Sequence, residues 1–158
     1  MYKCCIFDLD GTLVNSIYAI QKSVNDTLSY WNMREISVEE SRLYVGDGYK
    51  KLLERSLIAC GDKELAHYDE AVDRYQDIFR KCCMYRVEAY EGIRELLEFL
   101  KSQGILIAVL SNKPHPRTLD NVEGVFGKGY FNLVYGERED KGIRKKPCPD
   151  GVWAIAEE

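Results

Sequence analysis

Residues 4–12, which read Cys-Cys-Ile-Phe-Asp-Leu-Asp-Gly-Thr, carry the strongest indication of the fold. Its first four residues form a short apolar segment. A segment of this length, bounded by glycine and charged residues, predicts a strand buried inside a parallel sheet. Because side chains alternate along an extended segment, Asp8 and Asp10 are expected to face the same way while Leu9 points into the protein. The stretch therefore predicts a buried strand that ends in two acidic side chains.

Two later apolar segments are expected to be strands of the same sheet. Residues 105–110 form the second, which ends in Ser-Asn-Lys-Pro at 111–114, and residues 133–135 form the third. Helices are expected at 91–103, at 116–125 and from Pro149 onward. Strands that alternate with helices predict an α/β fold with a Rossmann-like parallel sheet.

An all-helical segment interrupts this pattern. Helical periodicity is expected from Ile17 to Trp31, from Tyr49 to Cys60 and from Asp62 to Met84, and Ser37 fits a capping box with Glu40. We therefore expect an α/β core made of residues 1–14 and 86–158, with an inserted helical cap domain at 15–85.

Polar side chains are expected to converge at one edge of the sheet, because ligands of open parallel sheets bind beyond the carboxyl ends of the strands. Asp8 and Asp10 end the first strand, Ser111 and Asn112 follow the second, and Lys146 lies in the loop after the third. Two neighbouring carboxylates repel each other unless a cation holds them, and Mg²⁺ prefers such oxygen ligands. The sequence therefore predicts a Mg²⁺ site at Asp8 and Asp10.

If a phosphate monoester bound at this edge of the sheet, each of these groups would have a chemical role. Asp8 would attack phosphorus and carry the phosphoryl group, while Asp10 would exchange protons with the leaving group and with water. Lys146 and Mg²⁺ would offset the charge on the transferring group. Gly11 permits a tight turn whose amides can face an anion. The predicted phosphate-binding residues are Gly11, Thr12, Ser111, Asn112 and Lys146.

Three segments resemble the motifs of the haloacid dehalogenase superfamily of phosphohydrolases. Residues 7–16 (Phe-Asp-Leu-Asp-Gly-Thr-Leu-Val-Asn-Ser) resemble its first motif, 109–114 (Val-Leu-Ser-Asn-Lys-Pro) its second, and 145–150 (Lys-Lys-Pro-Cys-Pro-Asp) its third. Residues 44–48 and 53–57 are similar to the helical cap of phosphoglycolate phosphatases.

The resemblance implies that Asp8 is the nucleophile and Asp10 the acid and base. It also implies that the Asp8 carboxylate and the Asp10 backbone carbonyl bind Mg²⁺. The second aspartate argues against a true dehalogenase, which lacks it, and against a cation-pumping ATPase, which has threonine there. The expected activity is hydrolysis of a small phosphorylated metabolite similar to phosphoglycolate.

The fourth motif of this family, a strand ending in Gly-Asp, is expected some distance after Lys146, but the sequence ends at Glu158 without it. This pattern favours a truncated version of a longer chain, the alternative being a natural remnant with reduced capacity. We therefore expect poor hydrolysis of phosphate esters by this 158-residue form, which could be inactive.

Other functions stay open within the same superfamily. A β-phosphoglucomutase-type phosphosugar mutase shares the aspartate pair, and a pyrophosphatase or nucleotidase would differ in the cap residues that select the substrate. A non-catalytic binding protein is a further alternative. Lys145 is the alternative to Lys146, Lys113 is either a surface residue or a contact at the edge of the site, and His67 and His115 are expected to face solvent.

The composition limits the kinds of binding partner and the cellular compartment that we expect. The 22 Lys and Arg residues against 26 Asp and Glu leave a charge of −4, without the basic surface typical of nucleic-acid binding. The longest apolar stretch, Ile105–Leu110, is far shorter than the roughly 20 residues of a membrane helix. The apolar strand follows Met1 closely, so no signal peptide is expected. Six cysteines without metal-site spacing favour free thiols in a reducing cytoplasm. The default expectation is a cytoplasmic monomer.

Overall fold

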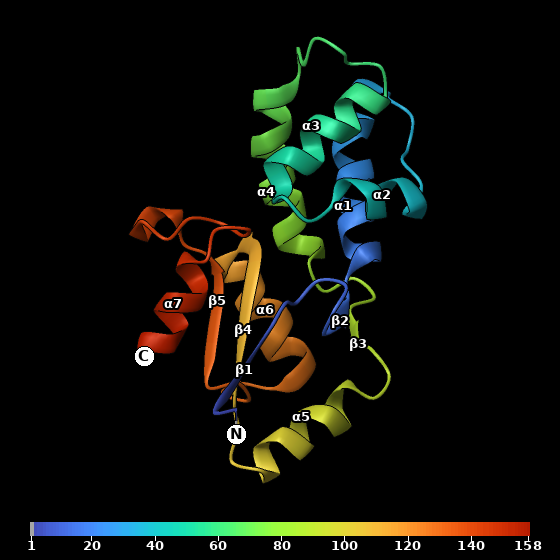
Figure 1. Ribbon diagram of the computed structural model, residues 1–158. Coiled ribbons are helices and arrows are strands. Elements are labelled where there is room, and N and C mark those ends of the chain that lie inside the picture. Colours follow the sequence, from blue (N-terminus) through green and yellow to red (C-terminus); the bar gives the residue numbers. More distant parts are fainter. Residues whose placement is uncertain (1) are drawn as a thin grey trace. The chain divides into compact units, whose positions relative to one another are not determined.

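The computed structural model describes residues 2–158 and divides into two compact units (Figure 1). The first unit comprises the residues up to Asn15 together with Glu88–Glu158, and the second comprises Ser16–Val87. We describe each unit by itself.

The first unit is built on a parallel sheet, as the sequence predicts. Among residues 2–158, this sheet has three strands in the order β1-β4-β5, and both strand pairs are parallel. In register, Phe7 lies opposite Val109, which lies opposite Val134. The strands are β1 (Cys4–Phe7), β4 (Leu106–Pro114) and β5 (Leu133–Glu137). A short antiparallel pair forms where the chain leaves and re-enters this unit, from β2 (Val14–Asn15) and β3 (Glu88–Ala89).

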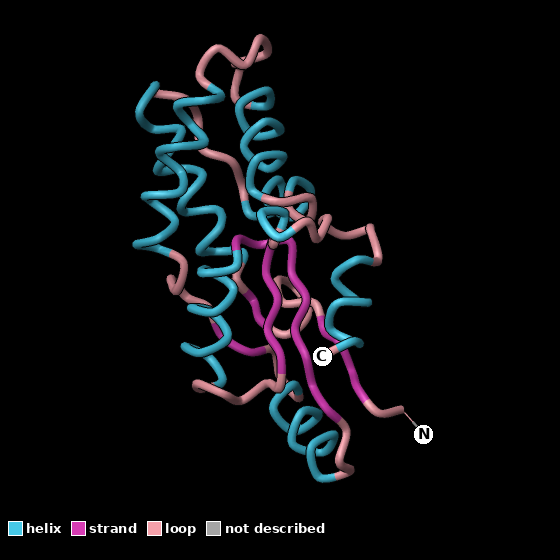
Figure 2. The backbone as a smooth tube through the Cα atoms, turned by 90° about the vertical axis from the view of Figure 1, so that its left-hand side faces the viewer, coloured by secondary structure: helices cyan, strands magenta, loops and turns pink. Residues whose placement is uncertain are grey.

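Helices cover both faces of the three-stranded sheet. Figure 2 shows α6 and α7 on opposite sides of it. Leu110 packs with Tyr135 and Ile155 in a buried cluster on the α7 side. Gly151 in α7 allows a close approach to β4, because a Cβ atom there would lie 2.6 Å from a methyl carbon of Leu110. The helices of this unit are α5 (Ile93–Ser102), α6 (His115–Phe126), α7 (Asp150–Glu157) and the 3₁₀ turn η2 (Glu139–Lys141).

The second unit is helical throughout its regular structure and has its own core. Its helices are α1 (Ile17–Leu28), the 3₁₀ turn η1 (Ser29–Trp31), α2 (Val38–Tyr44), α3 (Tyr49–Ala59) and α4 (Tyr68–Cys82). The capping box predicted at the start of α2 is confirmed, since Ser37 and Glu40 each bond the other's backbone amide. The buried side chains that pack together include Ile20, Val24, Leu28, Ile36, Leu52, Leu53, Leu57, Tyr75 and Phe79.

Three details of the expected secondary structure are wrong. The helix expected from Asp62 begins at Tyr68, because the Asp62 carboxylate accepts hydrogen bonds from the amides of Ala66 and His67 and holds a turn there. The second strand of the sheet continues to Pro114 instead of ending at Leu110. The helix expected from Ile17 to Trp31 ends as an α-helix at Leu28 and continues as the 3₁₀ turn η1.

Candidate functional site

The two predicted aspartates follow β1 in a tight turn. Asp8 is exposed, Leu9 is fully buried, and Asp10 is partly buried, as the alternation of side chains predicts. The carboxylate of Asp8 accepts a hydrogen bond from the Leu9 amide at 2.8 Å. Gly11 adopts a φ of 79°, a left-handed conformation that favours glycine. The turn therefore presents one carboxylate to solvent and keeps the second partly enclosed.

Backbone amides of this turn donate hydrogen bonds to carbonyl groups of the same segment. The amide of Gly11 donates to the carbonyl of Val14 at 2.9 Å, and the amide of Thr12 donates to the carbonyl of Leu9 at 3.3 Å. The phosphate-binding roles assigned to Gly11 and Thr12 from the sequence stay predictions.

Lys146 reaches the first aspartate from the loop after β5. Its ammonium group donates to Asp8 Oδ1 at 2.7 Å and to the Leu110 carbonyl at 3.1 Å. The two side chains are 32% and 44% exposed, so solvent screens the pair and it contributes little to stability. The importance of this ion pair lies in its geometry, because it places a cation beside the carboxylate that the sequence predicts to be the nucleophile.

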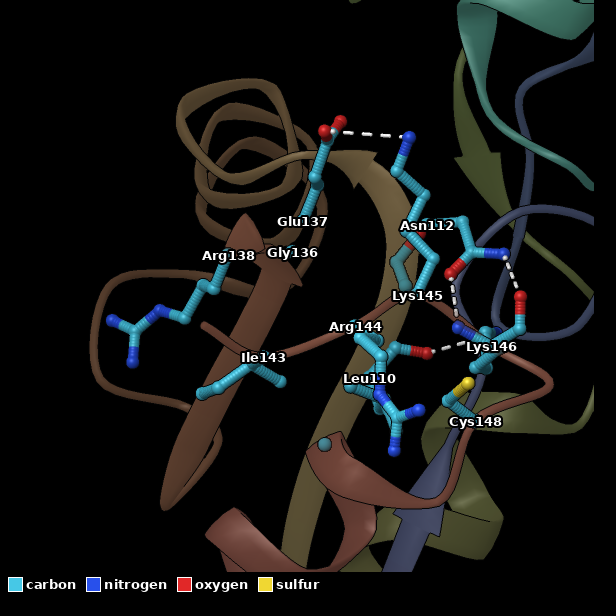
Figure 3. Close-up of a pocket in the computed structure, with 12 residues that line it drawn as sticks. Leu110, Asn112, Gly136, Glu137, Arg138, Ile143, Arg144, Lys145, Lys146 and Cys148 are labelled. Atoms are coloured by element: carbon cyan, nitrogen blue, oxygen red, sulfur yellow. Dashed lines mark hydrogen bonds and ion pairs between the residues drawn. The ribbon is translucent and has the colours of Figure 1, made fainter. Parts of the chain in front are cut away.

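Asn112 fixes the backbone of Lys146. Its side-chain oxygen accepts from the Lys146 amide at 2.9 Å, and its side-chain nitrogen donates to the Lys146 carbonyl at 3.1 Å. Figure 3 shows the two residues facing each other with both bonds drawn. Two bonds from one planar amide restrain the rotation of the lysine backbone. Asn112 thus contributes to the site by holding Lys146 in place.

The neighbouring Lys145 points elsewhere. Its ammonium group lies 3.4 Å from Glu137 and 3.3 Å from Glu139, and Figure 3 shows it turned toward Glu137. Burial lowers the pKa of Lys145, but the two carboxylates outweigh this effect and raise the pKa above its ordinary value. Of the two lysines that the sequence left open, the geometry favours Lys146 as the partner of Asp8.

Lys113 is the site residue whose role the sequence left undecided. Its ammonium group donates to Asp10 Oδ1 at 2.7 Å and also to the side-chain oxygen of Asn121. The lysine side chain is only 4% exposed, so it is neither a surface residue nor a loose contact at the edge of the site. A signal was available, because Ser111 and Lys113 share a face if the strand continues past Leu110.

Ser111 and His115 lie near these groups on β4 and at the start of α6. Ser111 is buried, and its hydroxyl oxygen accepts from the Lys113 amide at 3.2 Å. His115 was expected to face solvent, but its Nδ1 accepts a hydrogen bond from the Gly136 amide at 3.1 Å. Burial and the nearby Arg138 and Lys141 hold the pKa of His115 below its ordinary value.

The donor set at the end of β1 fits a magnesium ion. Within residues 2–158, no group of three or more His, Cys, Asp or Glu side chains is arranged to hold a metal. Mg²⁺ keeps several waters and binds through one or two carboxylates together with substrate phosphates, so it needs no larger protein cage. The oxygens of Asp8 and Asp10 are ligands of this type.

A parallel α/β sheet with acidic side chains after its first strand and a lysine after its third is the arrangement that the three sequence motifs imply. The family model for haloacid dehalogenase-like hydrolases matches residues 5–158, and the chain belongs to this family. The resemblance predicted from the motifs, and the α/β fold class with it, is confirmed.

Curated relatives are identical to this chain at about three in ten aligned positions. A phosphoglycolate phosphatase of Aquifex aeolicus is 32% identical over 98% of the chain, and one of Nitrosospira multiformis is 30% identical over 93%. A third, of Pseudomonas syringae pv. tomato, is 29% identical over 97%. The chain spans 69%, 65% and 56% of the lengths of these three relatives.

Solved structures have the same fold. A protein of Lactobacillus delbrueckii subsp. bulgaricus superposes with a TM-score of 0.87 at 24% identity, over 99% of this chain and 72% of its own. A haloacid dehalogenase-like hydrolase of Streptococcus pneumoniae superposes with a TM-score of 0.73 at 25% identity, over 87% of this chain and 62% of its own. In the described part of the chain, no helix has the length and apolar character needed to cross a bilayer.

Proposed function

We propose that this chain hydrolyses a small phosphate monoester similar to phosphoglycolate, with Asp8 as the nucleophile and Mg²⁺ as the cofactor. The observation that carries this proposal is the contact at 2.7 Å between Lys146 and Asp8, which joins the first and third motifs at the end of the sheet. The names of the curated relatives support the substrate class.

In the first step, an oxygen of the Asp8 carboxylate attacks phosphorus in line and the bond from phosphorus to the ester oxygen breaks. The product is an acyl phosphate on Asp8. The Lys146 ammonium group offsets negative charge on the transferring group, which is the main requirement of phosphoryl transfer. Ser111, within β4, would donate its hydroxyl group to a phosphoryl oxygen.

Asp10 supplies and removes protons. In its protonated form it gives a proton to the departing ester oxygen, so the alcohol leaves uncharged. It then takes a proton from a water molecule that attacks phosphorus and breaks the bond to Asp8. Inorganic phosphate leaves, the Asp8 carboxylate is restored, and Asp10 is again protonated.

The Asp8 carboxylate and the Asp10 backbone carbonyl would hold Mg²⁺. When bound, this ion offsets charge on the phosphoryl oxygens and on Asp8 during the approach of the substrate. We further propose that the protein is a cytoplasmic monomer. In the same proposal, the helical unit acts as a cap that selects the substrate.

Trapping the phosphoryl group on Asp8 tests this function directly. We expect that mixing the chain with Mg²⁺ and 4-nitrophenyl phosphate, followed by an acid quench and mass spectrometry, detects one added phosphoryl group. Borohydride cleavage should locate it at Asp8. Because a single transfer is observed, the experiment does not depend on the rate of turnover.

Matched variants give the controls. Asp8→Asn should abolish the adduct, and Asp10→Asn should prolong its life because water loses its base. Asp77→Asn removes a carboxylate of an exposed ion pair in α4 and should leave the adduct unchanged. If the unaltered chain forms no adduct, or forms it equally in Asp8→Asn, the proposed function is wrong.

A further inference from the structure

Lys113 is a buried lysine whose ammonium group contacts Asp10 and Asn121. Its side chain is 4% exposed, and its ammonium group donates to the Asp10 carboxylate and to the amide oxygen of Asn121. Lysine is rarely buried in proteins unless its charge is paired. Removing an ammonium group from water costs several kcal/mol, which an ion pair recovers only with good geometry. Such a pair is therefore better explained by the arrangement that it enforces than by stability.

The ion pair with Lys113 restrains the Asp10 carboxyl group. The Asp10 side chain is 23% exposed, compared with 4% for its lysine partner. Lys113 binds the Oδ1 atom at 2.7 Å and restricts rotation of the carboxyl group, while part of the side chain stays open to solvent. A group that must transfer protons to a bound ester needs this combination of fixed orientation and access.

Helix α6 fixes Lys113 in turn. Asn121 is fully buried and accepts from the lysine ammonium group, while the Thr118 hydroxyl donates to the Lys113 carbonyl at 3.2 Å. The helix thus holds the lysine at both its side chain and its backbone. The arrangement parallels that of Asn112 and Lys146, in which an asparagine holds the lysine that contacts the other aspartate.

We propose that Lys113 is a positioning residue that orients the Asp10 carboxyl group for proton transfer, and that Asn121 holds Lys113 in the required place. This inference rests on the proposed phosphatase function and assigns a role that Lys146, in the third motif, does not fill. Lys146 contacts Asp8 and acts on the transferring phosphoryl group, whereas Lys113 acts through Asp10 on the leaving group.

The dependence of the first step on the leaving group tests this role. A nitrophenolate ion leaves readily without a proton, whereas the alkoxide of 2-phosphoglycolate needs one. In single-turnover measurements of leaving-group release, Lys113→Met should therefore slow the reaction of 2-phosphoglycolate about 100-fold, the scale of general-acid catalysis, and leave that of 4-nitrophenyl phosphate nearly unchanged. Lys113→Arg keeps the charge and should restore part of the loss.

A second variant and a control keep the test decisive. Asn121→Asp preserves size but offers the lysine a competing carboxylate, so it should produce the same selective loss. Lys128→Met removes an exposed lysine and should change neither rate. Equal slowing of both substrates, or no slowing in folded Lys113→Met and Asn121→Asp, overturns the inference while the unaltered chain still transfers phosphate. Absence of transfer in the unaltered chain instead refutes the proposed function, and the inference with it.

Discussion

Two lysines, each placed by an asparagine, contact the two aspartates that follow β1. Asn112 and Asn121 lie on different elements, yet both use a planar amide to restrain a lysine. The pairs differ in burial, since the lysine that contacts Asp8 is 32% exposed and the one that contacts Asp10 is 4% exposed. A cation open to solvent can meet an incoming anion, whereas a buried cation can only orient its partner.

The neutral state of His115 makes stability depend on pH. Its Nδ1 accepts from the Gly136 amide, and burial first, then Arg138 and Lys141, hold its pKa below the ordinary value of 6.5. The unfolded chain therefore binds more protons than the folded one in the window just below pH 6.5. Stability should fall as the pH is lowered through this window and level off below the folded pKa.

Urea unfolding at a series of pH values measures this effect. His115→Asn keeps an acceptor near the Gly136 amide but cannot take up a proton in this range, so its stability should fall less over the same window. If the stability of the unaltered protein and of His115→Asn falls equally as the pH is lowered, other groups cause the pH dependence.

At the scale of elements, the close packing of β5 against α6 sets the position of Lys113. A Cβ atom at Gly136 would lie 2.5 Å from the Cα of His115 and from the Thr118 hydroxyl oxygen, and 2.7 Å from the Lys113 carbonyl. Backbone atoms cannot move aside as a flexible side chain can. Only glycine therefore lets the strand approach the first turns of α6, which hold the lysine.

Replacing glycine by alanine at two different positions, with opposite expected effects on stability, tests this packing. Gly136→Ala should destabilise the protein by about 1–3 kcal/mol through overpacking. Gly124→Ala, at an exposed position inside α6, should stabilise it by about 0.5–1 kcal/mol, because glycine is a poor helix former. Thermal or urea unfolding measures both, and a neutral Gly136→Ala variant would contradict the close approach.

For the whole molecule, each of the two units contains a cluster of buried side chains of its own. The helical cluster that contains Leu53 draws only on residues of Ser16–Val87, and the sheet cluster that contains Leu110 draws only on the other unit. Local stability follows such contiguous packing. The two units should therefore respond separately to the loss of a buried side chain.

Hydrogen exchange resolves the response of each unit. Leu53→Ala, at a fully buried position, should cost about 2–5 kcal/mol and lower amide protection mainly within Ser16–Val87. Val109→Ala removes fewer buried atoms and should lower protection mainly in the strands of the sheet. Equal loss across both units in either variant would mean that they unfold as one.

Local patterns in the sequence account for much of this structure. The apolar segments that become the strands and the capping box at Ser37 follow from patterns among neighbouring residues. The sequence does not predict the end of β4, because residues 111–113 are polar and residue 114 is proline. Pairing of Pro114 with Glu137 across a register shift extends the strand. The start of α4 was missed because Asp62 caps a turn instead of a helix.

By itself, the sequence determined the family, the fold class and the pair of aspartates after the first strand, because motif order and side-chain alternation are local and periodic properties. Which lysine contacts which aspartate depends on the packing of distant segments. Those contacts join residues 138 positions apart for Lys146 and Asp8, and 103 for Lys113 and Asp10. No periodic pattern spans such separations, since they are set by the packing of the strands and of α6 around the end of the sheet.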